Sequence, residues 1–274
     1  MNQVNQDSRN NPLLSSLGIE ETSHSSLGWN GKLDKKPKTA AVILAGGSGE
    51  RFGRPEGKQL IVLAGNPLLT WSIAACNAVP DIGLIVVVCP ADRMDEYRAE
   101  AIDPYHFLTP ITVAPAGDTR QESAFSGMEY VPESYEFVLI HDGARPMITP
   151  DLVQHSLNVL KGNIDADGVV VGYPTIDTPK LVDENGIIIG TPDRNMFWSA
   201  QTPQVFRASF YRRAHASALS DGFMGTDDAS LIERLGGRVL MVEGSRINTK
   251  VTVYDDYKMV TAVTEAQEFV PELG

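Results

Sequence analysis

A glycine-rich segment that also carries basic residues is the strongest chemical signal in the sequence. Residues 44–59 read LAGGSGERFGRPEGKQ. Glycines let the backbone approach a ligand closely and turn N–H groups toward it, and Arg51 and Lys58 add fixed positive charge. This composition predicts a cradle for a triphosphate, although neither G-x-x-x-x-G-K-[ST] nor G-x-G-x-x-G is present. The alternative is a plain glycine turn.

A second motif, HDGARP at residues 141–146, follows an apolar run. A carboxylate at Asp142 can hold Mg²⁺ against phosphates, while Arg145 can bind an anion. The alternative is that Asp142 caps the turn that follows. We expect His141 to pack at the end of the strand, because no second histidine stands at the spacing of a zinc site.

Other polar motifs are spread along the chain, and each is weak by itself. They read GDTRQES (117–123), DTPK (177–180), DRN (193–195), QTPQ (201–204), TDDA (226–229) and NTKVT (248–252). The TDDA segment is expected to begin a helix, and capping is its expected role.

The elements that must position these motifs can be read from hydrophobic spacing. Short β-branched runs predict buried strands at Thr39–Leu44, Leu84–Cys89, Ile111–Ala114, Phe137–Ile140, Gly168–Val171 and Val239–Val242. Helical spacing separates them at Pro67–Ala78, Ala91–Ala101, Thr119–Tyr130 and Pro150–Leu160. Such alternation predicts an α/β fold, a largely parallel sheet wrapped by helices, with ligands beyond the carboxyl ends of the strands.

Two segments depart from this alternation. In Thr175–Arg194, Asn185-Gly186 stands between two β-like runs, which predicts a hairpin arm that packs on something else, such as a second subunit. Residues 1–37 are rich in Asn, Ser and Gly and have no sustained period. We expect a disordered N-terminal extension there, without the basic start and apolar core of a signal peptide, and a single enzyme domain at 38–274.

Charge and composition exclude several classes of function. The chain has 23 Lys+Arg against 35 Asp+Glu, a formal net charge of −12. This balance argues against a general nucleic-acid binder and against docking on an anionic membrane. The only two cysteines, Cys76 and Cys89, are too few for a disulfide framework. A reducing cytoplasm is therefore expected, with both thiols packed in the interior.

Taken in order, these motifs resemble a known family. The chain is similar to the cytidylyltransferases of small polyol phosphates, and above all to the 2-C-methyl-D-erythritol 4-phosphate cytidylyltransferases of the non-mevalonate isoprenoid pathway. The resemblance rests on a set of motifs that occur in the family's order over residues 38–265. They are the glycine loop with Arg and Lys-Gln, the Gly-Asp…Arg…Ser helix start, His-Asp-x-x-Arg-Pro, Asp-Thr-x-Lys, Asp-Arg, Thr-Pro-Gln, Thr-Asp and Asn-x-Lys-Val-Thr. One departure is Gly57, where the family usually has proline before the lysine; a less preorganised loop is expected.

The resemblance implies a Rossmann-like nucleotide-diphospho-sugar transferase fold with a protruding β-hairpin arm, and transfer of a cytidylyl group from CTP to the polyol phosphate with release of pyrophosphate. It implies Mg²⁺ at Asp142 and a homodimer formed through the arm. The implied catalytic residues are Arg51, Lys58, Arg194 and Lys250. The implied nucleotide-binding residues are Ala45, Gly46, Gly47, Gly49, Gly117, Asp118, Ser123, Asp142 and Gly143. Those implied for the second substrate are Arg145, Thr178 and Thr202, of which Thr178, like Arg194, could serve the neighbouring subunit.

Two other readings stay open at this point. Ribitol 5-phosphate cytidylyltransferases share the same catalytic parts, although Trp198 is more typical of the methylerythritol enzymes. A nucleotide-binding protein that has lost its chemistry is the alternative of another class. The presence of Arg51, Lys58, Asp142 and Lys250 argues against it.

Overall fold

The structure is a computed structural model that describes residues 37–47, 49, 52–53 and 57–268. The predicted N-terminal extension therefore lies, except for Pro37, outside the described residues. No helix in these ranges is long and apolar enough to cross a membrane.

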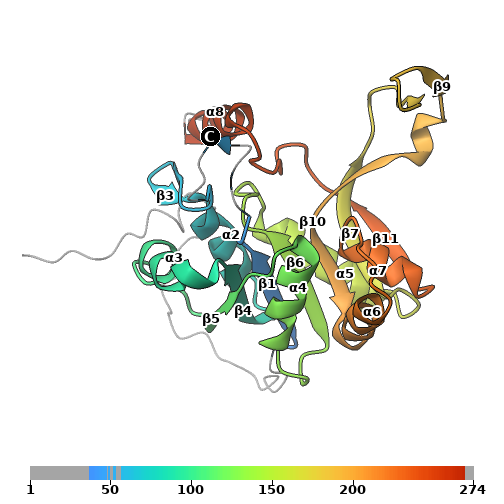
Figure 1. The fold of residues 1–274 in the computed structure, drawn as a ribbon. Coiled ribbons are helices and arrows are strands. Elements are labelled where there is room, and N and C mark those ends of the chain that lie inside the picture. Colours follow the sequence, from blue (N-terminus) through green and yellow to red (C-terminus); the bar gives the residue numbers. More distant parts are fainter. Residues whose placement is uncertain (1–36, 48, 50–51, 54–56, 269–274) are drawn as a thin grey trace, which may run out of the picture.

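A seven-stranded sheet forms the centre of the described chain (Figure 1), in the order β11-β7-β10-β6-β1-β4-β5. All its strands run parallel except β10, which is antiparallel to both neighbours. Their bounds are β1 Thr39–Leu44, β4 Ile82–Cys89, β5 Ile111–Pro115, β6 Phe137–Asp142, β7 Gly168–Pro174, β10 Trp198–Arg207 and β11 Val239–Glu243. A small separate ribbon pairs β2 (Val62–Leu63) with β3 (Asn66–Pro67). The mostly parallel α/β sheet is as predicted.

The six predicted strands are confirmed, and the seventh strand of this sheet, β10, was not predicted; nor was the short β2–β3 ribbon. The centre of β10 reads Gln-Thr-Pro-Gln, a polar run with a proline, which is atypical of a strand between two others. Its pairing with β7 is interrupted between Ala200 and Gln204, where the Thr202–Pro203 peptide bond is cis. The ladder resumes at Gln204, so the proline occupies an irregular stretch where its missing N–H breaks no regular pair.

Helices cover both faces of the sheet, and alternate residues of each strand feed two different cores. Ala41 and Ile43 of β1 pack with α2, α3 and α5, whereas Ala40 and Val42 pack with α4, α6 and α7. Burial on both faces explains why the strands lack polar alternation. The helices are α2 Leu68–Asn77, α3 Met94–Ala101, α4 Arg120–Glu129, α5 Pro150–Gly162, α6 Ala208–Ser220, α7 Asp228–Arg234 and α8 Tyr254–Glu268, with short 3-10 turns at η2 Ala91–Arg93 and η3 Arg194–Met196.

The four predicted helices and the helix start at TDDA are also confirmed. Thr149 caps α5 through its hydroxyl, and Asp227 caps α7 by accepting from Ser230 N–H at 3.0 Å. Helices α6 and α8 were not predicted. The last helix, α8, packs on the outer side of α2 through a third apolar cluster that joins Val260 to Leu68 and Trp71.

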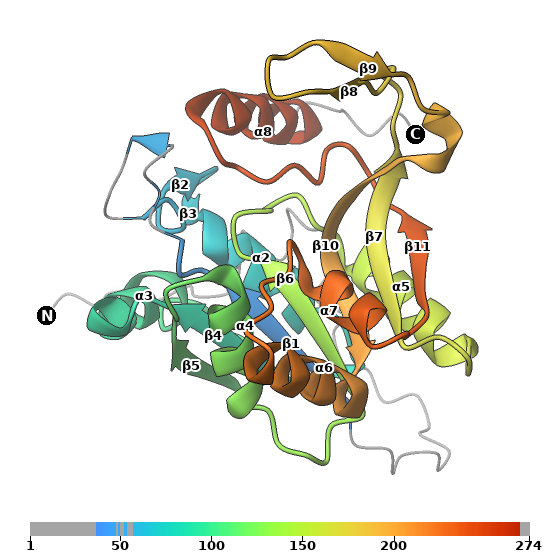
Figure 2. The ribbon, with the colours of Figure 1, turned by 45° about the vertical axis from the view of Figure 1, so that its right-hand side comes forward.

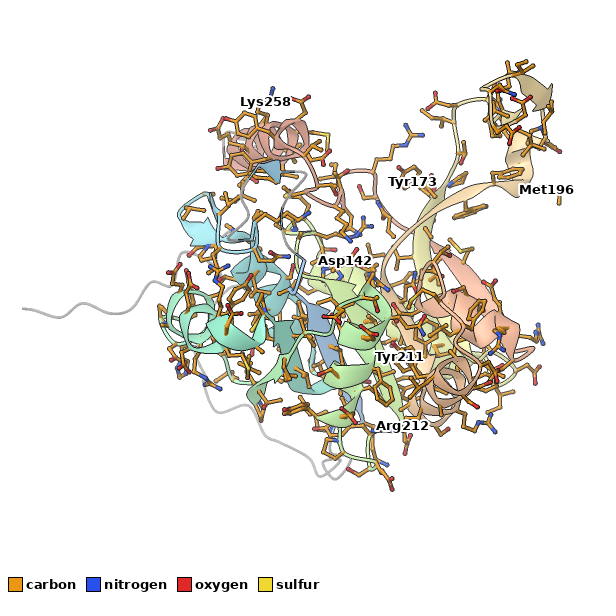
Figure 3. The ribbon with its side chains drawn as sticks, viewed as in Figure 1. Asp142, Tyr173, Met196, Tyr211, Arg212 and Lys258 are labelled. Atoms are coloured by element: carbon orange, nitrogen blue, oxygen red, sulfur yellow. The ribbon has the colours of Figure 1, made fainter. Side chains whose placement is uncertain are left out.

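The predicted hairpin arm leaves the sheet between the end of β7 and the start of β10 (Figure 2). Its two strands are β8 (Leu181–Val182) and β9 (Ile188–Gly190). At the tip, Gly186 has a φ of 79°, and the Asp183 carboxylate accepts the N–H groups of Asn185 and Ile187. Met196, on the same arm, lies well away from Asp142 (Figure 3).

Gly127→Ala tests how closely α4 rests on the sheet. A Cβ at Gly127 would lie 2.4 Å from Val42 Cγ1 and 2.7 Å from Val88 Cγ2, so the variant should lose about 1–3 kcal/mol of unfolding free energy. Gly162→Ala, at the last residue of α5 with no atom within 4 Å, is the control and should leave stability unchanged or raise it by up to ~1 kcal/mol. Urea unfolding of both variants provides the comparison, and equal midpoints would contradict the packing described.

Candidate functional site

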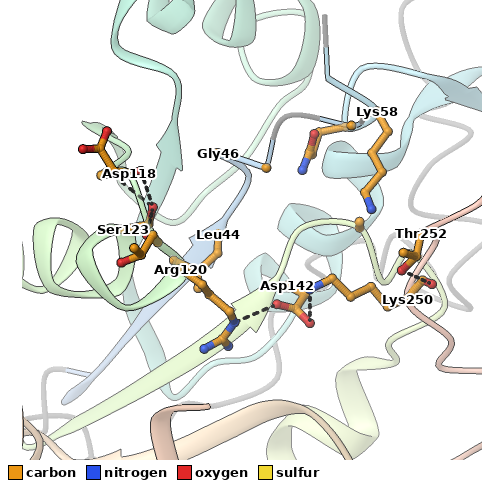
Figure 4. Close-up of a pocket in the computed structure, with 15 residues that line it drawn as sticks. Leu44, Gly46, Lys58, Asp118, Arg120, Ser123, Asp142, Lys250 and Thr252 are labelled. Atoms are coloured by element: carbon orange, nitrogen blue, oxygen red, sulfur yellow. Dashed lines mark hydrogen bonds and ion pairs between the residues drawn. The ribbon is translucent and has the colours of Figure 1, made fainter. Parts of the chain in front are cut away.

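A pocket of about 400 Å³ opens beyond the carboxyl ends of β1, β5 and β6 (Figure 4). It joins four segments that are far apart in the sequence: the loops after these three strands and the stretch before α8. The lining residues are Leu44, Gly46, Gly47, Gly49, Lys58, Gln59, Gly117, Asp118, Thr119, Arg120, Ser123, Asp142, Ala144, Lys250 and Thr252. Nine of the residues predicted for the site therefore share one cavity.

The glycine loop is held close to its neighbours by backbone contacts. Ala45 N–H donates to the Val88 carbonyl at 2.7 Å, and Gly143 N–H donates to the Leu44 carbonyl at 2.8 Å. A Cβ at Gly46 would lie 2.4 Å from the Cβ of Ala116, so only glycine lets the loops after β1 and β5 approach this closely. Ala45 and Gly143 thus brace the loop from outside the pocket lining, while Gly46 and Gly47 face the cavity.

Lys58 enters the pocket from a backbone that proline could not follow. Gly57 has a φ of 90°, whereas the proline ring fixes φ near −65°. Replacing the family's usual proline with Gly57 therefore changes the backbone conformation before Lys58, in addition to making the loop less rigid. The side chains of Lys58 and Gln59 are both buried at the pocket wall. Arg51, predicted beside Lys58, lies outside the described residues.

Asp142 is the electrostatic centre of the pocket. Its Oδ2 lies 3.1 Å from Arg145 Nε and 3.2 Å from Lys250 Nζ, and its Oδ1 lies 3.4 Å from Arg120 Nε. Arg120 and Lys250 reach it from opposite sides (Figure 4). Burial alone would raise the pKa of this carboxyl, but the three cations hold it well below its usual range. Asp142 is therefore an anion throughout the pH range in which enzymes work.

Behind the pocket, a hydrogen-bonded frame fixes Asp142 and the segment that carries Lys250. The Thr202 hydroxyl accepts the N–H of Asp142 at 3.0 Å, and Arg145 Nη1 donates to the Asn248 carbonyl at 2.9 Å. Asn248 in turn donates to the Thr202 carbonyl at 2.9 Å. Thr202 and Arg145, predicted for the second substrate, are thus placed in this frame outside the pocket lining, with Thr202 only 2% exposed.

The other end of the pocket is shaped by the start of α4. The Ser123 hydroxyl accepts the N–H of Gly117 at 3.1 Å and donates to the Thr119 carbonyl at 2.9 Å. Thr119 and Glu122 form a reciprocal capping box. A Cβ at Gly117 would lie 2.4 Å from the Cβ of Glu122, so this turn also requires glycine. Ser123 therefore holds the loop in shape, and Asp118 is exposed beside it.

Two predicted residues lie on the arm and outside this chain's own pocket. Arg194 is exposed and donates from Nη1 to the Ile176 carbonyl at 3.3 Å. Thr178 is exposed on the same arm. The described part of one chain therefore does not bring these two residues to Lys58, Asp142 and Lys250.

The structure adds site residues to which the sequence had assigned no role. Arg120 was part of a quoted motif, yet its contact with Asp142 was not foreseen. Its Nη1 also pairs with Asp228 Oδ2 at 2.5 Å. The sequence offered one signal for the role of Asp228. One aspartate is enough to cap α7, so the second acid of the pair Asp227-Asp228 needs another explanation. Among the described residues no group of three or more His, Cys, Asp or Glu side chains is arranged to hold a metal ion.

Comparisons with known proteins point in one direction. The profile of a family described as 2-C-methyl-D-erythritol 4-phosphate cytidylyltransferase matches residues 39–266. The protein of that name from Syntrophotalea carbinolica is 42% identical over 222 residues, covering 81% of this chain and 94% of the relative. One from Geobacter metallireducens is 38% identical over 234 residues, covering 84% and 98%. The crystal structure of 4-diphosphocytidyl-2C-methyl-D-erythritol synthase from Anaerococcus prevotii matches with a TM-score of 0.74 and 26% identity, over 84% of this chain and 100% of that one.

His141 should make folding stability depend on pH, since it is fully buried behind Asp142 with its Nδ1 3.0 Å from the Thr202 hydroxyl. Burial lowers the pKa of His141 from 6.5 to about 4. The unfolded chain therefore binds a proton that the folded chain does not, and the free energy of unfolding should fall as pH drops from about 6.5 to about 4. His141→Gln should make this slope shallower in urea titrations, whereas exposed His106→Gln should not; an unchanged slope in both would contradict the buried neutral ring.

Proposed function

This chain belongs to the 2-C-methyl-D-erythritol 4-phosphate cytidylyltransferase family, and we propose that its pocket carries out the family reaction with Lys58, Asp142 and Lys250 at its centre. CTP and 2-C-methyl-D-erythritol 4-phosphate give 4-diphosphocytidyl-2-C-methyl-D-erythritol and pyrophosphate. The supporting observation is a single cavity lined by a glycine loop, two lysines and one ionised carboxylate, which is paired with one of the lysines. A protein that had lost its chemistry would have no reason to keep this arrangement.

The reaction asks the protein for positioning and charge rather than for proton transfer. A phosphate oxygen of the polyol phosphate forms a bond to the α-phosphorus of CTP, and the bond from that phosphorus to the β-phosphate oxygen breaks. The nucleophile is already an anion, so little general-base help is needed. We propose that Gly46 and Gly47 receive the triphosphate, and that Lys58 and Arg51 stabilise the charge that grows on the α- and leaving phosphates.

Lys250 is the cation best able to transfer from protein to substrate. Arg120 is also paired with Asp228, and Arg145 also donates to the Asn248 carbonyl. The Lys250 side chain is 36% exposed, against 31% for Arg120 and 11% for Arg145, and among the described residues its ion pair is with Asp142. We propose that Lys250 exchanges this carboxylate for a substrate phosphate, while the two arginines continue to balance Asp142.

The donor set also fits a magnesium ion. Mg²⁺ is often bound by one or two carboxylates, with phosphate oxygens and water completing its coordination. Asp142 offers an ionised carboxylate at the pocket wall, and within the described part of the chain its Oδ1 has a long contact with Arg120, 3.4 Å from Nε. We propose that Asp142 would hold the ion, which when bound neutralises charge on the phosphates.

The arm supports a homodimer in which each subunit completes its neighbour's site. Its exposed apolar side chains are Ile176, Leu181, Val182, Ile187, Ile188, Ile189, Met196, Phe197 and Trp198. Monomers rarely expose so many apolar groups on one projection. We propose that the arms pair two chains, and that Arg194 and Thr178 bind the polyol phosphate in the partner's pocket.

The two cysteines favour a reducing compartment. Cys76 and Cys89 are buried and not disulfide-bonded, so the prediction that they pack in the interior is confirmed. Burial raises the pKa of both thiols to about 12, which leaves them protonated and unreactive. On this basis we place the enzyme in the cytoplasm.

Pyrophosphate release is the experiment that tests the function. The chain should release pyrophosphate from CTP with 2-C-methyl-D-erythritol 4-phosphate, and much more slowly with ribitol 5-phosphate, because the relatives described above carry the methylerythritol name. Faster release with ribitol 5-phosphate would favour that enzyme. If neither polyol phosphate gives pyrophosphate, the result would favour a nucleotide-binding protein that has lost its chemistry.

Lys58→Ala should lower kcat about 10²–10³-fold, because a charge-assisted contact to the transition state is lost. Lys161 offers a control: it pairs with Asp81 at 3.0 Å and does not line the pocket, so Lys161→Ala should keep kcat within a few-fold. The same steady-state assay measures both. Near wild-type turnover in Lys58→Ala would contradict the proposed role of Lys58 in stabilising the transition state.

Arg194→Ala should raise KM for the polyol phosphate more than KM for CTP, and mixing variants shows whether Arg194 acts in the partner's pocket. With the polyol phosphate held well below the KM of the Arg194→Ala variant, Lys58→Ala and Arg194→Ala chains each impair every site of their own dimers. In a mixed dimer one site receives both residues intact, so random exchange should restore about a quarter of wild-type activity. Mixtures that stay as inactive as the separate variants, despite confirmed subunit exchange, would place Arg194 in its own chain's site.

A further inference from the structure

Arg120 lies between two carboxylates of very different surroundings. Its Nε is 3.4 Å from Oδ1 of Asp142 at the pocket wall, and its Nη1 is 2.5 Å from Oδ2 of Asp228. Its side chain is 31% exposed and lines the pocket, whereas that of Asp228 is 1% exposed. The guanidinium is therefore held tightly by Asp228 on its buried side and contacts Asp142 on its pocket side.

The rear carboxylate is anchored by α6 and α7. Asp228 is the first residue of α7, and its Oδ1 accepts the hydroxyl of buried Tyr211 at 2.5 Å. His215 Nε2 lies 4.0 Å from the same oxygen, and burial lowers the pKa of this histidine, which keeps it neutral near pH 7. Among the described groups packed here, Arg120 is thus the cation that balances Asp228.

Stability alone does not explain this buried pair. Taking two charges out of water is costly, and apolar replacements of buried ion pairs are often neutral or stabilising. The helix start does not need Asp228 either, because Asp227 supplies the cap. What the pair does achieve is to fix the direction of the guanidinium that faces Asp142.

We propose that Asp228 is a positioning residue that acts through Arg120 on Asp142. This inference rests on the proposed function. When Lys250 leaves Asp142 for a substrate phosphate, Arg145 remains on Oδ2 and Arg120 remains on Oδ1. Asp228 keeps Arg120 in that place, since an untethered guanidinium beside a triphosphate would turn to the phosphates and release the carboxylate.

Asp228→Asn should therefore lower kcat about tenfold or more, as small misplacements at reacting groups do. KM for CTP should stay the same or fall, because removing a negative charge near the triphosphate cannot weaken its attraction. Asp227→Asn is the matched control: it removes the adjacent charge, asparagine caps helices as well as aspartate, and kcat should stay within a few-fold.

A double-mutant cycle separates positioning from a purely structural role. In an Arg120→Ala background, Asp228→Asn should cause no further loss of kcat, because Asp228 acts only through Arg120. Thermal unfolding of each variant checks the fold. If Asp228→Asn does not fold, Arg120→Lys replaces it: lysine keeps the charge but lacks the fork that reaches both carboxylates, so kcat should fall with little change in KM for CTP.

The proposal would be overturned if Asp228→Asn lowered kcat by the same factor with and without Arg120→Ala. Wild-type kcat in both Asp228→Asn and Arg120→Lys would also overturn it. The wild-type chain is measured in the same pyrophosphate assay. An inactive wild type would refute the proposed function, and the inference with it. If the wild type is active but the two substitutions lower kcat independently of each other, the positioning role alone is refuted.

Discussion

The site depends on one buried carboxylate and the cations that balance it. An ionised Asp142 at the end of β6 would be prohibitively costly to bury without partners. Its partners come from the start of α4, the turn after β6 and the segment before α8, which lie far apart in the sequence. The sheet must bring these segments to one edge, and the frame around Thr202 and Asn248 must hold them there.

The same cluster explains how an acidic chain can handle polyanions. A net charge of −12 excludes a broad basic surface, but a few fixed cations in a low-dielectric cleft can still attract a triphosphate. The resemblance implied five cations for the site. Lys58 and Lys250 line one pocket and Arg145 lies directly behind it, whereas Arg194 lies on the arm and Arg51 lies outside the described residues. Arg120 was not expected and joins the cluster.

The sequence carried the fold and much of the pocket because the signals are local. Apolar runs such as Thr39–Leu44 predict buried strands. Gly46 and Gly117 stand where the backbone passes so close to Ala116 and Glu122 that a Cβ would clash. Strand β10 was missed because its Gln-Thr-Pro-Gln centre resembles a loop, and only pairing with β6 and β7 makes it a strand. The roles of Thr202 and Asp228 depend on contacts across 60 and 108 positions, which no local pattern records.

The most direct measurement is a crystal structure of the chain with an uncleaved CTP analogue. The triphosphate should lie along Gly46 and Gly47, with Lys58 and Lys250 within hydrogen-bond distance of phosphate oxygens. Arg120 and Arg145 should remain on Asp142. A nucleotide bound elsewhere, or one bound in the pocket with Lys250 still paired to Asp142, would contradict the exchange on which the proposed mechanism rests.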